Sequence, residues 1–386
     1  MMAPALFDFP PPTHGHVDVL IIAGEHSGDE HAARMVREFR GQRPGAVVAA
    51  LGGPKLAAAG AQLLHDLTAA SVVGLVEVLR HYSYFQALFA ETLRWIETHR
   101  PRAVCFIDYP GFNLRLAAAL RERGLSVKGG GTIQALFYIS PQIWAWKAKR
   151  RFTMARDLDA MAVIFPFEPK CYADTTLPVE FVGHPFVAPD YVSPVRHDPQ
   201  GPVLLLPGSR RQAVARIFPG LLAGFRAFGQ REAVVLYPSQ EILEVLRTLA
   251  PPPNVRCVEV GEAATHGPAV AASAVLTSSG TMSMHCALAG IPGAIAYRAN
   301  PLTYVLGRML VQVEYLGIAN LLLGEPMYPE YIQNAATPAA LAAELRACVQ
   351  EPARQQRTTE QSRRLRALLA VGGRGTAGEW LAGHVA

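Results

Sequence analysis

Residues 17–29 read VDVLIIAGEHSGD, and this stretch decides the fold class. Its first part, Val17–Ala23, is a short run of aliphatic and β-branched side chains that predicts a buried strand. Gly24 permits a tight turn, and the pattern becomes helical over Ser27–Arg40. A buried strand joined by such a turn to a helix is the repeating unit of a parallel sheet covered by helices. The segment therefore predicts an α/β protein.

The alternation of strand and helix continues in two series, separated by a polar, proline-rich passage. The first series predicts further strands at Ala46–Leu51, Ala103–Asp108, Ile133–Tyr138, Ala160–Phe165 and Glu180–Gly183. The second series predicts strands at Val203–Leu206, Ala233–Tyr237, Val255–Val260, Ala274–Thr277 and Ala294–Tyr297. Two series in a chain of 386 residues predict two doubly wound domains that face a central cleft.

The domain boundaries follow from this division. We expect a loose N-terminus over 1–16, a first domain over 17–184, a linker over 185–202, a second domain over 203–350, and C-terminal helices over 351–386 that pack back on the first domain.

Composition excludes several classes of protein. The net charge of +5 is too mild for a nucleic-acid-binding protein, and five scattered cysteines without a CxxC pair argue against a disulfide framework or a zinc site. No Lys or Arg precedes the first apolar run, so a secretory signal peptide is not supported, and no stretch is long enough to span a bilayer. We therefore expect a cytosolic protein that is soluble or peripheral to a membrane.

Two glycine-containing turns in the second series favour nucleotide diphosphate binding. Gly208-Ser209-Arg210 follows one predicted strand, and Ser278-Ser279-Gly280-Thr281 follows another and opens a helix. Both offer hydroxyls and free helix N–H groups, and Arg210 adds a cation that can contact phosphate through two hydrogen bonds. Neither turn is a Walker A loop, and the chain has no GxGxxG motif.

Two turns in the first series are further candidates. Ser27 and Gly28 stand where exposed N–H groups could bind an anion or a sugar hydroxyl, although a turn that serves only the fold explains them equally well. Asp108 ends a predicted strand, where burial would raise its pKa and suit it to proton abstraction. The alternative is that Asp108 only caps the following helix. Asp157-Leu158-Asp159 matches a DxD metal motif, but three residues carry little weight.

Two segments are rich in apolar or aromatic side chains. The stretch from Val72 to Phe89 packs in the core or offers a surface to acyl chains or a membrane, through Val73, Leu75, Val76, Leu79, Tyr82 and Phe85. The segment from Tyr138 to Arg151 places two Trp beside four cations, which suits sugar, acyl and phosphate groups. The structural alternative is a solvated basic helix whose Trp side chains pack in the core. Binding of nucleic acid is a weaker alternative.

Together, the segments resemble the lipid-A-disaccharide synthase family from about residue 17 to 340. They come in that family's order as AGEHSGD, GGPKLAAAG, VVGLVEVL, FIDYPGFN, YISPQIWAWKAKR, LLLPGSR, SSGTMSMHCALAG, AYRANPLTY and IANLLLGEPMYPEYIQN. The resemblance implies a GT-B fold of two Rossmann-like domains, without a metal or other cofactor. It also implies a cytoplasmic enzyme peripheral to the inner membrane. The oligomeric state is left open, with a homodimer as one option.

The resemblance also implies a reaction. UDP-2,3-diacylglucosamine would donate its sugar to the 6-hydroxyl of 2,3-diacylglucosamine 1-phosphate, with inversion. Asp108 matches the proposed base, and Arg210, Ser279, Gly280 and Thr281 would hold the diphosphate. Asn320 and Gln333 lie in motifs that line the donor site.

Four positions depart from the family pattern. His285 stands where a Glu usually binds ribose hydroxyls, Ala213 replaces a Glu, Gly111 an Asp, and Ala319 a Pro. These departures keep three alternatives open: a GT-B transferase with a different UDP-sugar or acceptor, a non-catalytic relative that binds lipid or nucleotide, and a UDP-sugar 2-epimerase. The retained Asp108 disfavours the binding protein, and the apolar stretch after Val72 disfavours the epimerase.

Overall fold

The computed structural model describes residues 7–68, 78–229, 231–260, 269–300, 313–370 and 375–385, with the backbone alone at 78–82. The chain divides into two compact units, Met1–Pro185 with Val371–Ala386, and Phe186–Ala370. The boundary therefore falls at the start of the expected linker, and the rest of that linker belongs to the second unit.

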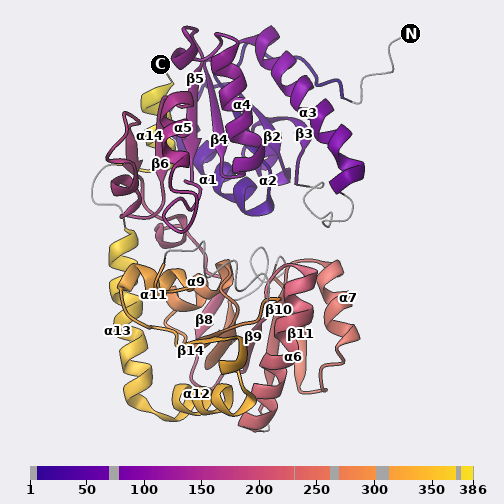
Figure 1. Cartoon of the computed structure of the whole chain (residues 1–386), viewed down its shortest axis with the longest axis vertical. Helices are drawn as coiled ribbons and strands as arrows, with labels where there is room; N and C mark the ends of the chain where they lie inside the picture. Colours follow the sequence, from indigo (N-terminus) through magenta and orange to yellow (C-terminus); the bar gives the residue numbers. More distant parts are fainter. Residues whose placement is uncertain are drawn as a thin grey trace. The chain divides into compact units, whose positions relative to one another are not determined.

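Within the described residues, the first unit has a seven-stranded parallel sheet in the order β3-β2-β1-β4-β5-β6-β7 (Figure 1). Its strands are β1 (Val19–Ala23), β2 (Val48–Gly52), β3 (Gln62–Asp66), β4 (Ala103–Ile107), β5 (Gln134–Tyr138), β6 (Ala160–Val163) and β7 (Val179–Phe181). Its helices are α1 (His26–Gln42), α2 (Pro54–Ala58), α3 (Val78–His99), α4 (Pro110–Glu122), α5 (Arg150–Asp157) and α14 (Ala377–His384), with short 3₁₀ turns η2 (Val127–Gly129) and η3 (Glu168–Tyr172).

Both faces of this sheet are covered, because every second side chain of a strand points to the same face. Leu20 and Ile22 of β1 join a core with Leu116 of α4 and Trp95 of α3. The alternate residues of β1 are also fully buried, and α1 packs on the strand. Five consecutive buried residues explain why the strand has no amphipathic alternation.

Residues 7–16 are not loose, contrary to our expectation for the N-terminus. Phe9 is buried, and its N–H donates to Glu91 Oε1 at 3.0 Å. Trp95 Nε1 donates to Pro10 O at 2.9 Å. The segment is therefore held on α3 by an apolar side chain and by hydrogen bonds to its backbone.

The C-terminal helices divide between the two units. Helix α14 lies against α1 in the first unit, where Gly378 N donates to Glu38 Oε2 at 3.0 Å and Arg43 Nη2 donates to Ala382 O at 3.1 Å. A side chain at Gly378 would overlap the backbone of α1. Helix α13 (Pro352–Leu369) belongs to the second unit. Within the expected 351–386 block, therefore, the return to the first domain involves α14 and not α13.

The described part of the second unit contains a six-stranded parallel sheet in the order β11-β10-β9-β13-β14-β15. Its strands are β9 (Val203–Leu206), β10 (Ala233–Tyr237), β11 (Val255–Glu259), β13 (Ala274–Thr277), β14 (Gly293–Tyr297) and β15 (Glu330–Ile332); β8 (Val195–His197) and β12 (Val270–Ala272) form a separate pair. Its helices are α6 (Arg211–Phe228), α7 (Gln240–Thr248), α9 (Thr281–Leu288), α11 (Ile318–Leu323), α12 (Pro338–Gln350) and α13.

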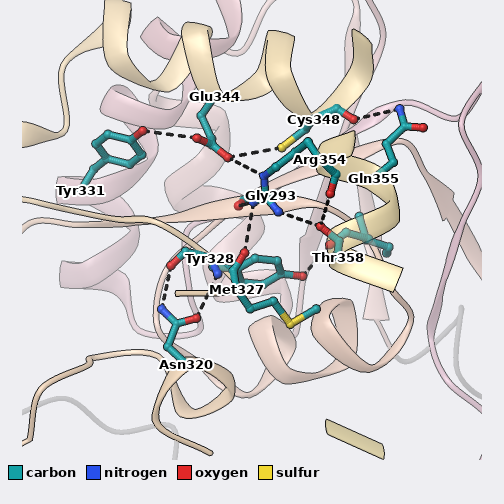
Figure 2. Close-up of polar contacts among 11 residues, drawn as sticks. Gly293, Asn320, Met327, Tyr328, Tyr331, Glu344, Cys348, Arg354, Gln355 and Thr358 are labelled. Carbon is teal, nitrogen blue, oxygen red and sulfur yellow. Dashed lines mark hydrogen bonds and ion pairs between the residues drawn. The ribbon is translucent and has the colours of Figure 1, made fainter. Parts of the chain in front are cut away.

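Arg354 of α13 ties several of these elements together (Figure 2). Its side chain is 4% exposed; Nη2 donates to Gly293 O at 2.9 Å and Met327 O at 3.1 Å. Its Nε donates to Glu344 Oε1 at 3.1 Å, and its Nη1 donates to Thr358 Oγ1 at 2.7 Å. The guanidinium therefore donates to a carboxylate and to two buried backbone carbonyls that belong to different parts of the domain.

We predict that Arg354→Ala destabilises the second domain by about 3 kcal/mol or more, because it leaves Glu344 and two carbonyls without this donor. Arg357→Ala is the matched control, since Arg357 lies exposed on the same helix. The free energy of unfolding, from urea denaturation, measures both. Equal stability of the two variants would contradict a structural role for Arg354.

Candidate functional site

The strand order of the first sheet reverses between β1 and β4, and Asp108 comes directly after β4. From β1 the sheet continues to β2 and β3 on one side, and to β4 and the later strands on the other. Ala23 pairs with Ile107, so the residues that follow them, Gly24 and Asp108, leave the sheet side by side. Ligands of doubly wound sheets bind at this kind of switch point. The structure thus brings the turn that begins at Gly24 next to Asp108.

The backbone at Asp108 is held in an unusual conformation. Asp108 and Tyr109 have φ angles of 43° and 47°, in the left-handed region that residues other than glycine seldom adopt. Asn113 is fully buried, and its Nδ2 donates to Asp108 O at 2.8 Å and to Ile107 O at 3.3 Å. The Tyr109 ring lies where a side chain on Gly24 would be, so only glycine fits there. These contacts stabilise a strained turn that fixes Asp108.

The surroundings of Asp108 shift its proton affinity. Burial, followed by the negative charge of Glu25, raises the pKa of Asp108 to about 6, while the Tyr109 backbone N–H opposes the shift. A carboxyl group with a pKa of about 6 is mostly ionised at neutral pH, yet it binds a proton more strongly than an ordinary Asp. This is the property that a general base needs.

The loop after β1 and the start of α1 contain residues that could bind a ligand and a residue, Asp29, that stabilises the fold. Glu25, and not Ser27, is the N-cap of α1, and its side chain makes no capping hydrogen bond. Ser27 is exposed at the helix start, whereas Gly28 is buried beside Ala23. The first N–H groups of α1 are therefore suited to an anion or a hydroxyl.

Asp29, in the same motif, is structural. Its carboxylate accepts hydrogen bonds from the N–H groups of Gly53 at 2.8 Å, Lys55 at 3.0 Å and Leu56 at 3.1 Å. It thereby caps α2 from a distance in the sequence. A side chain on Gly53 would collide with this carboxylate, which explains the second glycine of the GGPK run.

A fully buried carboxyl group, Glu168, lies near the partly buried Asp108. Glu168 is 1% exposed and accepts hydrogen bonds from Phe165 N at 3.0 Å and from Trp144 Nε1 at 3.4 Å. Burial raises its pKa to about 8 against those two donors, and the charge of Asp108 adds to the rise. No local pattern in the sequence indicates that Glu168 is buried.

The second sheet also reverses its strand order, between β9 and β13. Leu206 pairs with Thr277, and Ser278 N donates to Leu206 O at 2.8 Å. Gly208 has a φ of 112°, and a side chain there would come within 3.3 Å of Ser278 Oγ. The two glycine-containing turns predicted to bind a diphosphate are therefore neighbours at a switch point.

Both turns open into helices with free N-termini. Helix α6 begins after Arg210 and α9 begins at Thr281 after Gly280, and neither N-cap makes a side-chain hydrogen bond to its helix. Arg210, Gly280 and Thr281 are exposed, and Ser279 is partly exposed. Two uncapped helix ends, hydroxyl groups and an exposed guanidinium have the chemistry that a diphosphate requires.

His285 lies in α9 with its ring largely covered. It is 6% exposed, and its ring stacks on Phe186 at a centroid distance of 4.0 Å and on Tyr191 at 5.7 Å. The aromatic contacts fasten the beginning of the second unit to α9. A contact between His285 and a nucleotide stays a prediction, and packing gives this residue a function of its own.

Asn320 and Gln333 use their amide groups within the second domain. Asn320 is fully buried; its Oδ1 accepts from Tyr328 N at 2.9 Å and its Nδ2 donates to Tyr328 O at 2.7 Å. Gln333 exchanges two hydrogen bonds with the backbone of Ala299, at 3.0 and 3.2 Å. Each shapes a loop, so any effect of Asn320 on the donor would be exerted through the backbone that it holds.

The predicted acyl surface lies mostly outside the described residues. Val73, Leu75 and Val76 are among those outside, as are the side chains of Leu79 and Tyr82. Phe85 is partly buried and packs against the core of the first domain. Of this set, Phe85 thus follows the alternative interpretation, core packing.

The DxD match is structural. Asp157 Oδ1 accepts from Arg121 Nε at 2.6 Å and from Arg156 Nε at 2.8 Å, while Asp159 Oδ2 accepts from Ala135 N at 2.8 Å. In the described part of the chain, no group of three or more His, Cys, Asp and Glu side chains could hold a metal ion.

The chain is a hexosyltransferase of the GT-B fold, with two doubly wound domains whose sheets each reverse their strand order. The glycotransferase of kitacinnamycin shares this fold with a TM-score of 0.56 and 16% identity, over 98% of this chain and 100% of that chain. The chain belongs to the lipid-A-disaccharide synthetase family, whose model matches residues 19–375.

The curated relatives extend over nearly the whole chain. The lipid-A-disaccharide synthase of Geobacter metallireducens is 37% identical over 374 residues, which cover 92% of this chain and 94% of the relative. That of Nitrosococcus oceani is 33% identical over 374 residues, 94% of each. A putative UDP-N-acetylglucosamine 2-epimerase from Listeria monocytogenes has a TM-score of 0.59 at 11% identity over 95% of this chain and 94% of its own, which shows a shared fold alone.

We predict that kcat/KM rises with pH through an apparent pKa near 6, because Asp108 accepts a proton only when it is ionised. Glu25→Gln removes a negative charge that raises this pKa, so the rise should move to lower pH. Glu122→Gln, an exposed carboxylate at the end of α4, is the control. The same pH profile in the wild type and in Glu25→Gln would show that Glu25 does not influence the base.

Proposed function

We propose that this protein transfers 2,3-diacylglucosamine from UDP to the 6-hydroxyl of 2,3-diacylglucosamine 1-phosphate. The products are a β-1,6-linked disaccharide and UDP. Membership of the lipid-A-disaccharide synthetase family supports this substrate pair. The single observation that carries the chemistry is Asp108, a fixed carboxylate at a switch point with a pKa of about 6.

Inversion at the anomeric carbon requires a base on the acceptor side. Asp108 takes the proton of the acceptor 6-hydroxyl as O6 forms its bond to C1 of the donor sugar. The bond from C1 to the diphosphate oxygen breaks at the same time, and its electron pair leaves with UDP. The restrained backbone at Asp108 limits the motion of the base, so little ordering is needed in the transition state.

The leaving diphosphate gains negative charge as this bond breaks. We assign its stabilisation to the N-termini of α6 and α9, with Ser279, Gly280 and Thr281 offering N–H and hydroxyl donors. Arg210 supplies a positive charge beside them. Helix ends keep their orientation during the reaction, which is why they favour the charged product state.

Both substrates carry acyl chains, so we place the enzyme on the cytoplasmic face of the inner membrane as a peripheral protein. No helix in the ranges that the structure describes is long and apolar enough to cross a membrane. Val73, Leu75, Val76, Leu79 and Tyr82 remain our candidates for contact with the acyl chains. A homodimer is compatible with this assignment, and nothing in it requires one.

We predict that Asp108→Asn lowers acceptor-dependent UDP release by about 10²–10⁴-fold, because the amide cannot take a proton. The measurement is UDP formed from UDP-2,3-diacylglucosamine with and without the 1-phosphate acceptor, with the disaccharide confirmed by mass. Asp8→Asn, whose side chain is 91% exposed, should retain full activity. Normal turnover by folded Asp108→Asn would contradict the proposed base, and no acceptor-dependent release by the wild type would contradict the proposed reaction.

A further inference from the structure

Residues 146–152 of the first domain expose two aromatic side chains among cations. We refer to this segment, Trp146-Lys147-Ala148-Lys149-Arg150-Arg151-Phe152, as the aromatic–basic ledge. Trp146 is 45% exposed and Phe152 is 48% exposed. Among the described residues with exposed large hydrophobic side chains, these two are the aromatic ones. The ledge has four cations and no acidic residue.

The exposure of Trp146 results from how the preceding loop is anchored. Ile143 and Ala145 are buried, at 3% and 8% exposure. Trp144 between them packs edge-on against Phe167 and donates to the buried Glu168. The loop is thus fastened on both sides, and Trp146 is presented to solvent by a structured segment.

Phe152 is presented in a similar way by α5. Met154 and Ala155 of this helix are buried in the core, whereas Phe152 lies on the opposite, solvent-facing side. Figure 1 shows α5 beside α4 in the first unit. An aromatic side chain on the outer face of a short helix costs free energy in water, and contact with an apolar phase would recover it.

Three of the four cations of the ledge, Lys147, Arg150 and Arg151, lie over its aromatic rings. Lys147 Nζ is 4.3 Å from the centre of the Trp146 ring, and the Arg151 guanidinium is 4.3 Å from that of Phe152. Arg151 is also paired with Asp174, at 2.6 Å. Lys147, Lys149 and Arg150 have no carboxylate partner within the described ranges. Three positive charges therefore stay available to an external anion.

We propose that the aromatic–basic ledge docks the protein on an anionic phospholipid surface. Tryptophan and phenylalanine rings partition into the interface between headgroups and acyl chains, while neighbouring Lys and Arg side chains contact lipid phosphates. A free phosphate would satisfy the cations alone, whereas a bilayer satisfies the cations and both rings. The charge and the apolar exposure of the ledge thus match a membrane better than a soluble anion.

The position of the ledge relative to Asp108 fits this partner. The ledge belongs to the segment that leaves β5, and β5 pairs with β4, so that Tyr138 lies opposite Ile107. Asp108 N donates to Tyr138 O at 3.0 Å. The segment that leads to the ledge therefore leaves the sheet next to the base. This inference rests on the proposed function only in that a docked ledge would bring Asp108 toward the lipid acceptor.

The test is binding of the full-length protein to vesicles of phosphatidylglycerol and phosphatidylethanolamine, measured by sedimentation at low and high salt. Trp146→Ser should weaken binding roughly tenfold, and Lys147→Gln with Lys149→Gln and Arg150→Gln roughly a hundredfold, at about fivefold per cation. High salt should weaken binding of the wild type. Val192→Ser is the matched control, because Val192 is 70% exposed in the second domain.

Two results would overturn the proposal. One is binding of the ledge variants, folded by circular dichroism, with the affinity of the wild type; the single Trp146→Ser variant serves if the triple variant unfolds. The other is a loss of UDP release by the ledge variants, with the lipid substrates supplied in detergent micelles, that is as large as their loss of vesicle binding. That result would assign the cations to the substrate phosphate. Weakened vesicle binding without any UDP release in the wild type would uphold the ledge and reject the proposed reaction.

Discussion

Both domains depend on the reversal of strand order in a parallel sheet. In the first domain, the sheet continues from β1 to β2 on one side and to β4 on the other. In the second domain, it continues from β9 to β10 on one side and to β13 on the other. The loops after two such neighbouring strands leave the sheet together and then separate toward different helices. Asp108 and the Gly24 turn stand at one reversal, and the turns at Gly208 and Ser278 stand at the other. The candidate chemistry therefore follows from topology.

At the first reversal, a reactive carboxylate must be partly buried without losing its charge at neutral pH. Burial and Glu25 raise the pKa of Asp108, yet only to about 6. Because the folded-state pKa is above that of an unfolded Asp, an ionised Asp108 costs stability at neutral pH, and protonation below about pH 6 relieves that cost. Asn113 and the Tyr109 contact with Gly24 hold the strained turn against this cost. The protein is thus less stable at neutral pH because it keeps an ionised base at this position.

The sequence predicted the strands that are apolar throughout. Val203–Leu206, Ala233–Tyr237 and Ala274–Thr277 match the structure to the residue, because buried parallel strands are uninterrupted apolar runs. It missed β3 (Gln62–Asp66) and β15 (Glu330–Ile332), whose partly exposed side chains mix polar and apolar residues. Pattern alone therefore finds the central strands, and of the edge strands it finds β7 and β11 but not β3 and β15.

For the candidate site, position at a strand end was enough to select Asp108, Arg210 and the turn at Ser279. The strand order that makes their loops neighbours is not encoded in any local pattern. Glu25 and Glu168 were missed as parts of the site for the same reason, since the fold brings each of them near Asp108. Asn113 stands in the FIDYPGFN motif, but its buried hydrogen bond to Asp108 O could not be predicted from the motif. The packing of Phe186 and Tyr191 on the His285 ring could not be predicted either, because these two residues lie about a hundred residues earlier in the chain.

The central claim is a division of labour, in which the first domain supplies the base and the second binds the nucleotide. Calorimetric titration of UDP into the wild type, Asp108→Asn and Arg210→Ala tests it most directly. We predict that Asp108→Asn binds UDP with the Kd of the wild type, while Arg210→Ala binds roughly tenfold or more weakly, because a charged hydrogen-bond donor to phosphate is lost. Weakened binding in Asp108→Asn together with unchanged binding in Arg210→Ala would contradict the account.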